Sequence, residues 1–160
     1  MQSKGKVLVT GGTGFIGTEL VEQLHKKGYE VTILDRKDKP IGLDHVKYIK
    51  GDLGNPAKCV FACAGQDYVI HLAAKARIPE SFINPDEYFD SNVTGTRNIL
   101  TAASAVGIRK FVFAGSSSVY GNNTAPNKPT HKPDPLNYYA MSKLFGEHLC
   151  RQYKIIFNLN

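Results

Sequence analysis

The chain has 160 residues, of which 42% are apolar and 21% are charged, and its formal net charge is +6. These values are ordinary for one globular domain, and they exclude the disordered, collagen-like and membrane-spanning classes. The basic residues are scattered without a dense run between aromatics, so we expect a solvated basic surface and no nucleic-acid partner. The N-terminus shows no signal-peptide pattern and no apolar run is long enough to span a bilayer, so we expect a cytoplasmic protein with no membrane association.

Short β-branched and apolar runs alternate with helical patterns along the chain. The expected strands are residues 6–10, 30–35, 46–50, 68–73 and 110–114. The expected helices between them are about residues 15–27, 56–64 and 85–106. This is the rhythm of βαβ units. It predicts an α/β fold of the Rossmann type, a doubly wound parallel sheet with helices on both faces, in one domain over residues 1–160.

Three further segments follow or interrupt this pattern. A stretch rich in Pro, Asn, Thr and Lys over residues 122–137 predicts a long surface loop, and loops of that length are often functional. A last helix is expected from about Tyr138 to Arg151, with residues 155–160 as the start of a sixth strand. Of the three cysteines, Cys59 and Cys63 have helical spacing and not that of a metal or redox pair, so we expect reduced cysteines and no metal site.

A glycine-rich turn joins the first expected strand to the first expected helix. Gly11, Gly14 and Gly17 stand at the G-x-x-G-x-x-G spacing of a dinucleotide fingerprint. Glycines let the backbone approach a pyrophosphate closely, and the positive end of the following helix stabilises its negative charge. The pattern therefore predicts a phosphate cradle, in preference to a purely structural tight turn.

Asp35 ends the second expected strand, near the separation from the glycine turn at which an acid reaches the ribose 2′-hydroxyl of NAD. A carboxylate there would repel the additional phosphate of NADP. Arg36 and Lys37 follow immediately, and cations beside the ribose can accept that phosphate; Asp35 could also be a turn former. The pattern favours NAD over NADP.

Tyr139 and Lys143 stand four residues apart, which places them on one face of the last expected helix. A nearby ammonium favours the phenolate, so the tyrosine becomes a usable general base. Ser116, Ser117 and Ser118 follow the fifth strand, at the edge where open parallel sheets bind their ligands. We interpret these residues as one catalytic site; the alternative is an exposed helix face and a polar loop.

Six ordered motifs can be read in this sequence, at residues 11–17, 51–53, 71–74, 92–96, 116–121 and 139–143. Together they resemble the NAD-dependent epimerase/dehydratase family of extended short-chain dehydrogenases, and residues 74–81 resemble its UDP-hexose 4-epimerase branch. The likeness covers the chain to about residue 150. Members of that family are much longer and use the additional part to bind the nucleotide sugar. The chain is thus expected to be the NAD-binding Rossmann domain, incomplete at its C-terminal end and without the substrate domain.

The resemblance implies roles for the motif residues. The implied cofactor-binding residues are Gly11, Gly14, Phe15, Ile16, Gly17, Asp35, Arg36, Asp52, Leu53, Leu72, Ala73, Ala74, Asn92, Tyr139 and Lys143. The implied catalytic residues are Ser116, Tyr139 and Lys143. The implied substrate-binding residues are Ser116, Ser117, Ser118 and Tyr139.

The activity that the resemblance implies is NAD-dependent epimerisation of a nucleotide sugar, in which C4 of a UDP-hexose is oxidised transiently and regains its hydride. Relatives that eliminate water or carbon dioxide carry an acid immediately before the valine of the Val-Tyr-Gly motif, where this chain has Ser118. Epimerisation is therefore favoured over a dehydratase or reductase. The second alternative is a non-catalytic NAD-binding or redox-sensing module, because this chain alone, whether fragment or natural short form, is expected to be nearly inactive. Helices near residues 92–106 and 139–151 are expected to form a homodimer.

Overall fold

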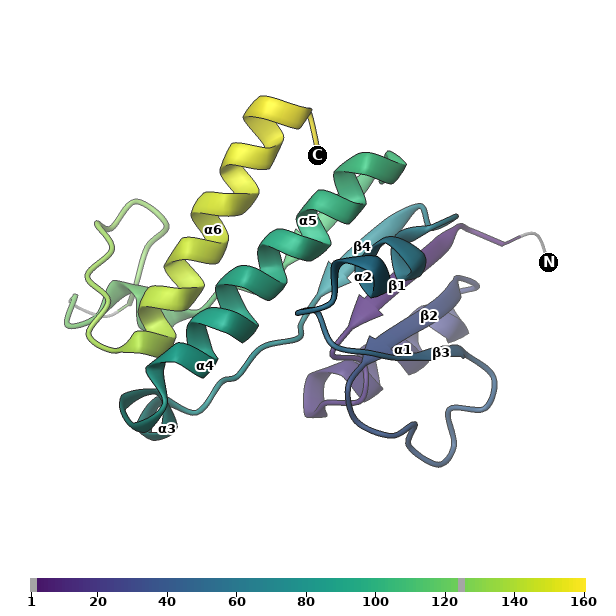
Figure 1. The fold of residues 1–160 in the computed structure, drawn as a ribbon, viewed down its shortest axis with the longest axis horizontal. Helices are drawn as coiled ribbons and strands as arrows, with labels where there is room; N and C mark the ends of the chain where they lie inside the picture. Colours follow the sequence, from purple (N-terminus) through teal and green to yellow (C-terminus); the bar gives the residue numbers. More distant parts are fainter. Residues whose placement is uncertain (1–2, 124–125) are drawn as a thin grey trace.

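The computed structural model describes residues 3–123 and 126–160, and its strands form a five-stranded parallel sheet (Figure 1). The strands are β1 (Lys6–Thr10), β2 (Glu30–Asp35), β3 (Lys47–Lys50), β4 (Tyr68–His71) and β5 (Lys110–Phe113). They lie in the order β3-β2-β1-β4-β5, and every neighbouring pair is parallel. The direction of strand addition reverses between β1 and β4, so the carboxyl ends of these strands flank a crevice.

Helices cover both faces of the sheet, so the expected doubly wound Rossmann fold is confirmed (Figure 1). On one face, Val9 and Ile33 pack with partly buried side chains of α1 (Phe15–Lys26). On the other face, Leu8 and Leu34 belong to a core that includes side chains of α2 (Pro56–Cys63), α5 (Gly95–Val106) and α6 (Tyr138–Phe157). Neighbouring residues of one strand point to opposite faces, which explains why the central residues of β1 and β2 are mostly apolar.

The helix expected over residues 85–106 consists of three parts. It begins as α4 (Pro85–Phe89), widens into a π-helical turn, η1 (Asp90–Thr94), and continues as α5. A short helix that the sequence analysis missed, α3 (Ile78–Ile83), precedes it. Both α3 and α4 have a proline in their first turn, the local signal that could have located them. The π-helical turn matters most for the site, because it contains Asn92.

The prediction of a sixth strand at residues 155–160 is wrong. Helix α6 continues to Phe157, because no glycine or proline stops it after Arg151. Asn158 then adopts a left-handed conformation with φ of 55° and turns the chain back toward the sheet. The last residue still contacts the edge of β5, where the Phe111 main-chain N–H donates a 2.7 Å hydrogen bond to the carbonyl of Asn160.

The remaining segments are connections. Between η2 (Ser117–Tyr120), a 3₁₀ turn, and α6 lies the expected loop over residues 122–137; its described parts contain neither helix nor strand, and residues 124 and 125 lie outside the described residues.

Cys59 and Cys63 are buried and unpaired, and burial raises the pKa of the Cys63 thiol to about 12. Of the helices in the described ranges, none combines the length and the apolar character that crossing a membrane requires.

Candidate active site

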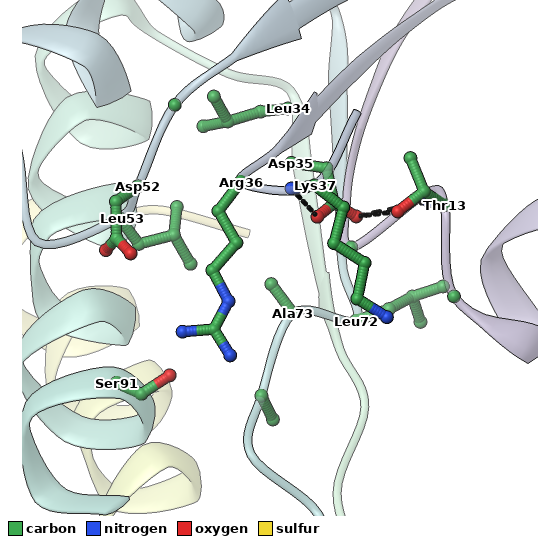
Figure 2. A pocket seen from close by; sticks show the side chains of 14 residues that line it. Thr13, Leu34, Asp35, Arg36, Lys37, Asp52, Leu53, Leu72, Ala73 and Ser91 are labelled. Atoms are coloured by element: carbon green, nitrogen blue, oxygen red, sulfur yellow. Dashed lines mark hydrogen bonds between the residues drawn. The ribbon is translucent and has the colours of Figure 1, made fainter. Parts of the chain in front are cut away.

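A cleft of about 220 Å³ lies at the carboxyl ends of β1, β2 and β4 (Figure 2). It collects most of the predicted cofactor-binding residues from four separate segments of the chain. Thr13, Leu34, Lys37, Gly51 and Ser91 also line it and were missed. The complete lining is Gly11, Thr13, Gly14, Leu34, Asp35, Arg36, Lys37, Gly51, Asp52, Leu53, Leu72, Ala73, Ala74 and Ser91.

The glycine turn presents bare main chain to this cleft. Gly11 has a φ of +72°, and a Cβ there would lie 2.7 Å from the main-chain nitrogen of Ala73. A Cβ at Gly17 would lie 2.3 Å from the carbonyl oxygen of Gly11. The turn leads directly into the first turn of α1, which carries no acidic residue and whose first N–H groups have no partner within the helix. This arrangement fits an anionic pyrophosphate, because close approach and positive potential coincide.

Asp35 faces the glycine turn from the end of β2. Its Oδ2 accepts hydrogen bonds from the hydroxyl of Thr13 at 2.7 Å and from the main-chain N–H of Thr13 at 3.2 Å. Its Oδ1 accepts one from the main-chain N–H of Lys37 at 3.1 Å. The side chains of Arg36 and Lys37 extend beside it into the cleft (Figure 2). The carboxylate is therefore held in one orientation near two cations.

Other predicted residues of the glycine segment lie outside the cleft lining. The side chains of Phe15 and Ile16 are 97% and 67% exposed in the first turn of α1. Gly17 is buried behind the turn, where the lack of a side chain lets α1 approach the main chain of Gly11 and Gly12. Of these three residues, Phe15 and Ile16 could reach a bound pyrophosphate mainly through their main-chain N–H groups.

A buried hydrogen-bond network supports the β4 wall of the cleft. His71, with 1% exposure, has Nδ1 2.6 Å from the Thr10 hydroxyl and Nε2 2.9 Å from the Thr96 hydroxyl. Burial lowers the pKa of His71 to about 3, so its ring is neutral. Because Thr96 donates its own proton to the Asn92 carbonyl, Nε2 of His71 must donate and Nδ1 must accept. The same Thr10 hydroxyl accepts a hydrogen bond from the main chain of Ala73.

Asn92, in the π-helical turn, connects that wall to α6. Its side chain accepts a hydrogen bond from the Lys75 N–H at 2.8 Å and donates one to the Lys75 carbonyl at 2.9 Å. It also donates to the Ser142 hydroxyl at 2.9 Å, and Ser142 in turn donates to the carbonyl of Tyr139. Asn92 does not line the cleft; it holds the segment that follows Ala74 against the helix that carries Tyr139 and Lys143. Ser142 is a residue that sequence reasoning missed.

Of the predicted catalytic residues, Ser116 follows β5, and Tyr139 and Lys143 belong to α6. None of the three lines the cleft at Asp35. Ser116 caps η2, and its hydroxyl lies 2.7 Å from that of Ser118, whereas Ser117 is exposed. Tyr139 is half-buried in the first turn of α6, with its ring edge-on to Tyr88. The serines of η2 and the Tyr139–Lys143 pair of α6 therefore lie on neighbouring elements, beyond the carboxyl end of β5.

Lys143 follows Tyr139 by one turn of α6 and is buried. Its Nζ lies 4.2 Å from the centroid of the Phe113 ring, a cation–π contact. Burial lowers the pKa of Lys143 to about 8, and the nearby Glu147 carboxylate partly opposes this shift. Burial thus makes this ammonium easier to deprotonate than that of an exposed lysine. Among the described residues, no group of three or more His, Cys, Asp and Glu side chains is arranged to hold a metal ion.

Comparisons with known proteins place this geometry in a family. The sequence profile of the NAD dependent epimerase/dehydratase family matches residues 7–160. UDP-glucose 4-epimerase 3 of Oryza sativa subsp. japonica is 37% identical over 163 residues, which covers 91% of this chain and 44% of the relative. A UDP-glucose 4-epimerase of Klebsiella pneumoniae is 39% identical over 129 residues, which covers 73% of this chain and 93% of the relative.

A solved structure agrees with the sequence comparisons. The crystal structure of UDP-glucose 4-epimerase from Brucella ovis in complex with NAD matches with a TM-score of 0.92 at 29% identity, over 98% of this chain and 50% of that one. The chain spans about half the length of the rice and Brucella proteins. The match of the family profile to nearly the whole chain shows that this protein belongs to the NAD-dependent epimerase/dehydratase family, whose cofactor is NAD.

Proposed function

We propose that this protein binds NAD in the cleft at the carboxyl ends of β1, β2 and β4 and inverts C4 of a UDP-hexose. The observation that carries the proposal is the connection between the two halves of the site. The cleft offers bare glycine main chain and Asp35 to a dinucleotide, and Asn92 joins its β4 wall to the helix of Tyr139 and Lys143. The similarity to proteins named UDP-glucose 4-epimerases supports the substrate class.

The chemistry follows from the residues of α6 and η2. NAD, when bound, supplies a hydride acceptor that can return the hydride. Tyr139 as phenolate removes the proton of the sugar 4-hydroxyl, and the ammonium of Lys143 stabilises that phenolate. Ser116 donates a hydrogen bond to the same oxygen as it becomes a carbonyl. After the keto sugar turns over, Tyr139 gives the proton back to the oxygen and C4 regains hydride on its other face.

The proposal is tested on the natural gene product that contains residues 1–160. Calorimetric titration measures NAD binding, and proton NMR follows the interconversion of UDP-glucose and UDP-galactose in the presence of NAD. We expect both binding and interconversion, with no net accumulation of reduced cofactor. NAD binding without interconversion would overturn the epimerase assignment and leave a binding module. Absence of NAD binding would overturn the assignment of the cleft itself.

The proposed oligomer is a homodimer that uses the outer faces of α5 and α6, which lie side by side (Figure 1). Tyr138, Met141 and Phe145 form an exposed apolar stripe on α6 at helical spacing. Light scattering should show a dimer that Phe145→Glu converts to a monomer. The control is Ile41→Glu, a fully exposed apolar residue in the loop between β2 and β3. A wild-type monomer at high concentration, or a dimer that both variants leave intact, would contradict this interface.

A further inference from the structure

We infer that Thr13 is a specificity-determining residue: its hydroxyl fixes the Asp35 carboxylate in the orientation that accepts the ribose of NAD and rejects the 2′-phosphate of NADP. This inference rests on the proposed NAD cleft. It goes beyond the assignment of Asp35, because it makes the discrimination depend on a side chain in the glycine turn. Thr13 lies between Gly12 and Gly14, at a position where the fingerprint requires no particular residue.

The geometry singles out the Thr13 hydroxyl among the groups that hold Asp35. Oδ2 receives two hydrogen bonds from Thr13, one from its main chain and the shorter one, 2.7 Å, from its side chain (Figure 2). Oδ1 receives a hydrogen bond from the main chain of Lys37. The hydroxyl is thus the side-chain donor in this set and the only one of the three that a substitution can remove without altering the backbone. Charge-assisted bonds of this kind are among the stronger hydrogen bonds in proteins.

Two cationic side chains line the cleft beside the same carboxylate. Arg36 and Lys37 both extend their side chains into the cleft beside Asp35 (Figure 2). Within residues 3–123 and 126–160, no ion pair joins either cation to Asp35, although both follow it directly in the chain. Without the Thr13 hydroxyl, one carboxylate oxygen loses its shorter hydrogen bond and can turn toward a guanidinium or ammonium group. A carboxylate paired in this way accepts a ribose hydroxyl less well and repels a phosphate less strongly.

A merely structural role for Thr13 makes a different prediction. If the hydroxyl only stabilised the glycine turn, its removal would weaken NAD and NADP binding equally, because both share the same pyrophosphate. If it orients Asp35, its removal changes the ratio of the two affinities. The ratio of dissociation constants is therefore the informative measurement, and it does not depend on turnover.

The experiment compares Thr13→Val with Thr13→Ser by calorimetric titration with NAD and with NADP. Valine has nearly the same shape and volume as threonine, and Thr13 is only half-buried, so the substitution fits the site. Thermal unfolding verifies that each variant is folded. We expect Thr13→Val to lower the preference for NAD about tenfold, which corresponds to about 1.4 kcal/mol. Thr13→Ser, which keeps a hydroxyl, should retain the preference of the wild type.

A second arm tests whether the effect acts through Asp35. In an Asp35→Asn background, Thr13→Val should leave the NAD to NADP ratio unchanged, because the charge to be oriented is absent. An unchanged ratio in the single Thr13→Val variant, or an equal change in both backgrounds, would overturn the inference. Failure of the wild type to bind NAD would instead refute the proposed function, so the two failures are distinguishable.

Discussion

The two ends of the site are built in different ways. At the glycine turn, main chain lines the cleft together with two short side chains, Thr13 and Asp35, which are hydrogen-bonded to each other; Asp35 also accepts hydrogen bonds from the main chain. At the other end, the reactive groups are long side chains on α6. Their position depends on the hydrogen bond between Ser142 of α6 and Asn92, which lies 50 residues earlier in the chain. The first end is made by two turns that follow the neighbouring strands β1 and β2, whereas the second depends on a contact between η1 and α6. The difference implies that NAD binding and turnover are separable properties.

The sharpest separation should come from Tyr139→Phe. The ring is retained, so its packing on Tyr88 survives, but the proton acceptor is lost. In the natural gene product, epimerase turnover measured by NMR should fall about 10²–10⁴-fold, the usual contribution of a general base, with NAD affinity unchanged. Tyr138→Phe, the neighbouring position on the outer face of α6, is the matched control and should retain turnover. A parallel loss of NAD affinity would show that the two ends are not separable.

Gly17→Ala should instead disrupt the glycine turn, the end of the site that is proposed to bind NAD. Its Cβ would lie 2.3 Å from the carbonyl of Gly11 and 2.7 Å from Cα of Gly12, main-chain atoms that cannot move aside cheaply. We expect about 3 kcal/mol of destabilisation, at the upper end of overpacking costs, and NAD binding too weak to measure by calorimetry. Gly14→Ala is the control, because its Cβ would meet only one atom, at 3.3 Å. Equal behaviour of the two variants in urea unfolding would contradict the packing argument.

A smaller effect should show how the two ends are coupled. Asn92→Ala removes three hydrogen bonds of a buried side chain and leaves the Lys75 main chain without its partners. We expect a loss of about 2–3 kcal/mol in urea unfolding, together with weaker NAD binding and slower turnover. Ala105→Ser, at an exposed position of the adjoining α5, should change both properties little. An Asn92→Ala variant that lost turnover alone would mean that the β4 wall does not depend on this contact.

The last expected effect concerns pH, and it is small at neutral pH because both states of His71 are then mostly unprotonated. The pKa of His71 falls from 6.5 to about 3 on folding, because burial disfavours the charged ring. The unfolded chain therefore binds more protons between these values, so His71 makes stability fall as pH decreases from 6.5 toward 3, by about 1.4 kcal/mol per pH unit. His71→Gln keeps polar atoms but does not titrate, and its unfolding free energy should decline less steeply over this range. Identical slopes for the two proteins would show that the histidine is not held neutral.

Local sequence patterns were sufficient for much of this molecule. The five strands, the glycine turn, the start of α1 and the position of Asp35 all follow from short-range periodicity and from the residue types that turns require. The cofactor cleft could be anticipated because its residues end consecutive parallel strands, and such ends necessarily meet at one edge of the sheet. For the same reason Ser116, which follows β5, was expected at that edge, and in the structure the turn that it begins contacts α6.

The tertiary structure decided what depends on contacts between distant residues. The π-helical turn at Asp90–Thr94, the neutral tautomer of His71 and the contact of Asn92 with Ser142, 50 residues away, leave no periodic signal. The hydrogen bond from Thr13 to Asp35 likewise requires the parallel pairing of β1 with β2, which brings the glycine turn to the end of β2. Sequence pattern specifies which residues a strand or helix buries, because burial follows from its repeat. Which polar groups meet is specified by the register between elements, and only the folded chain sets that register.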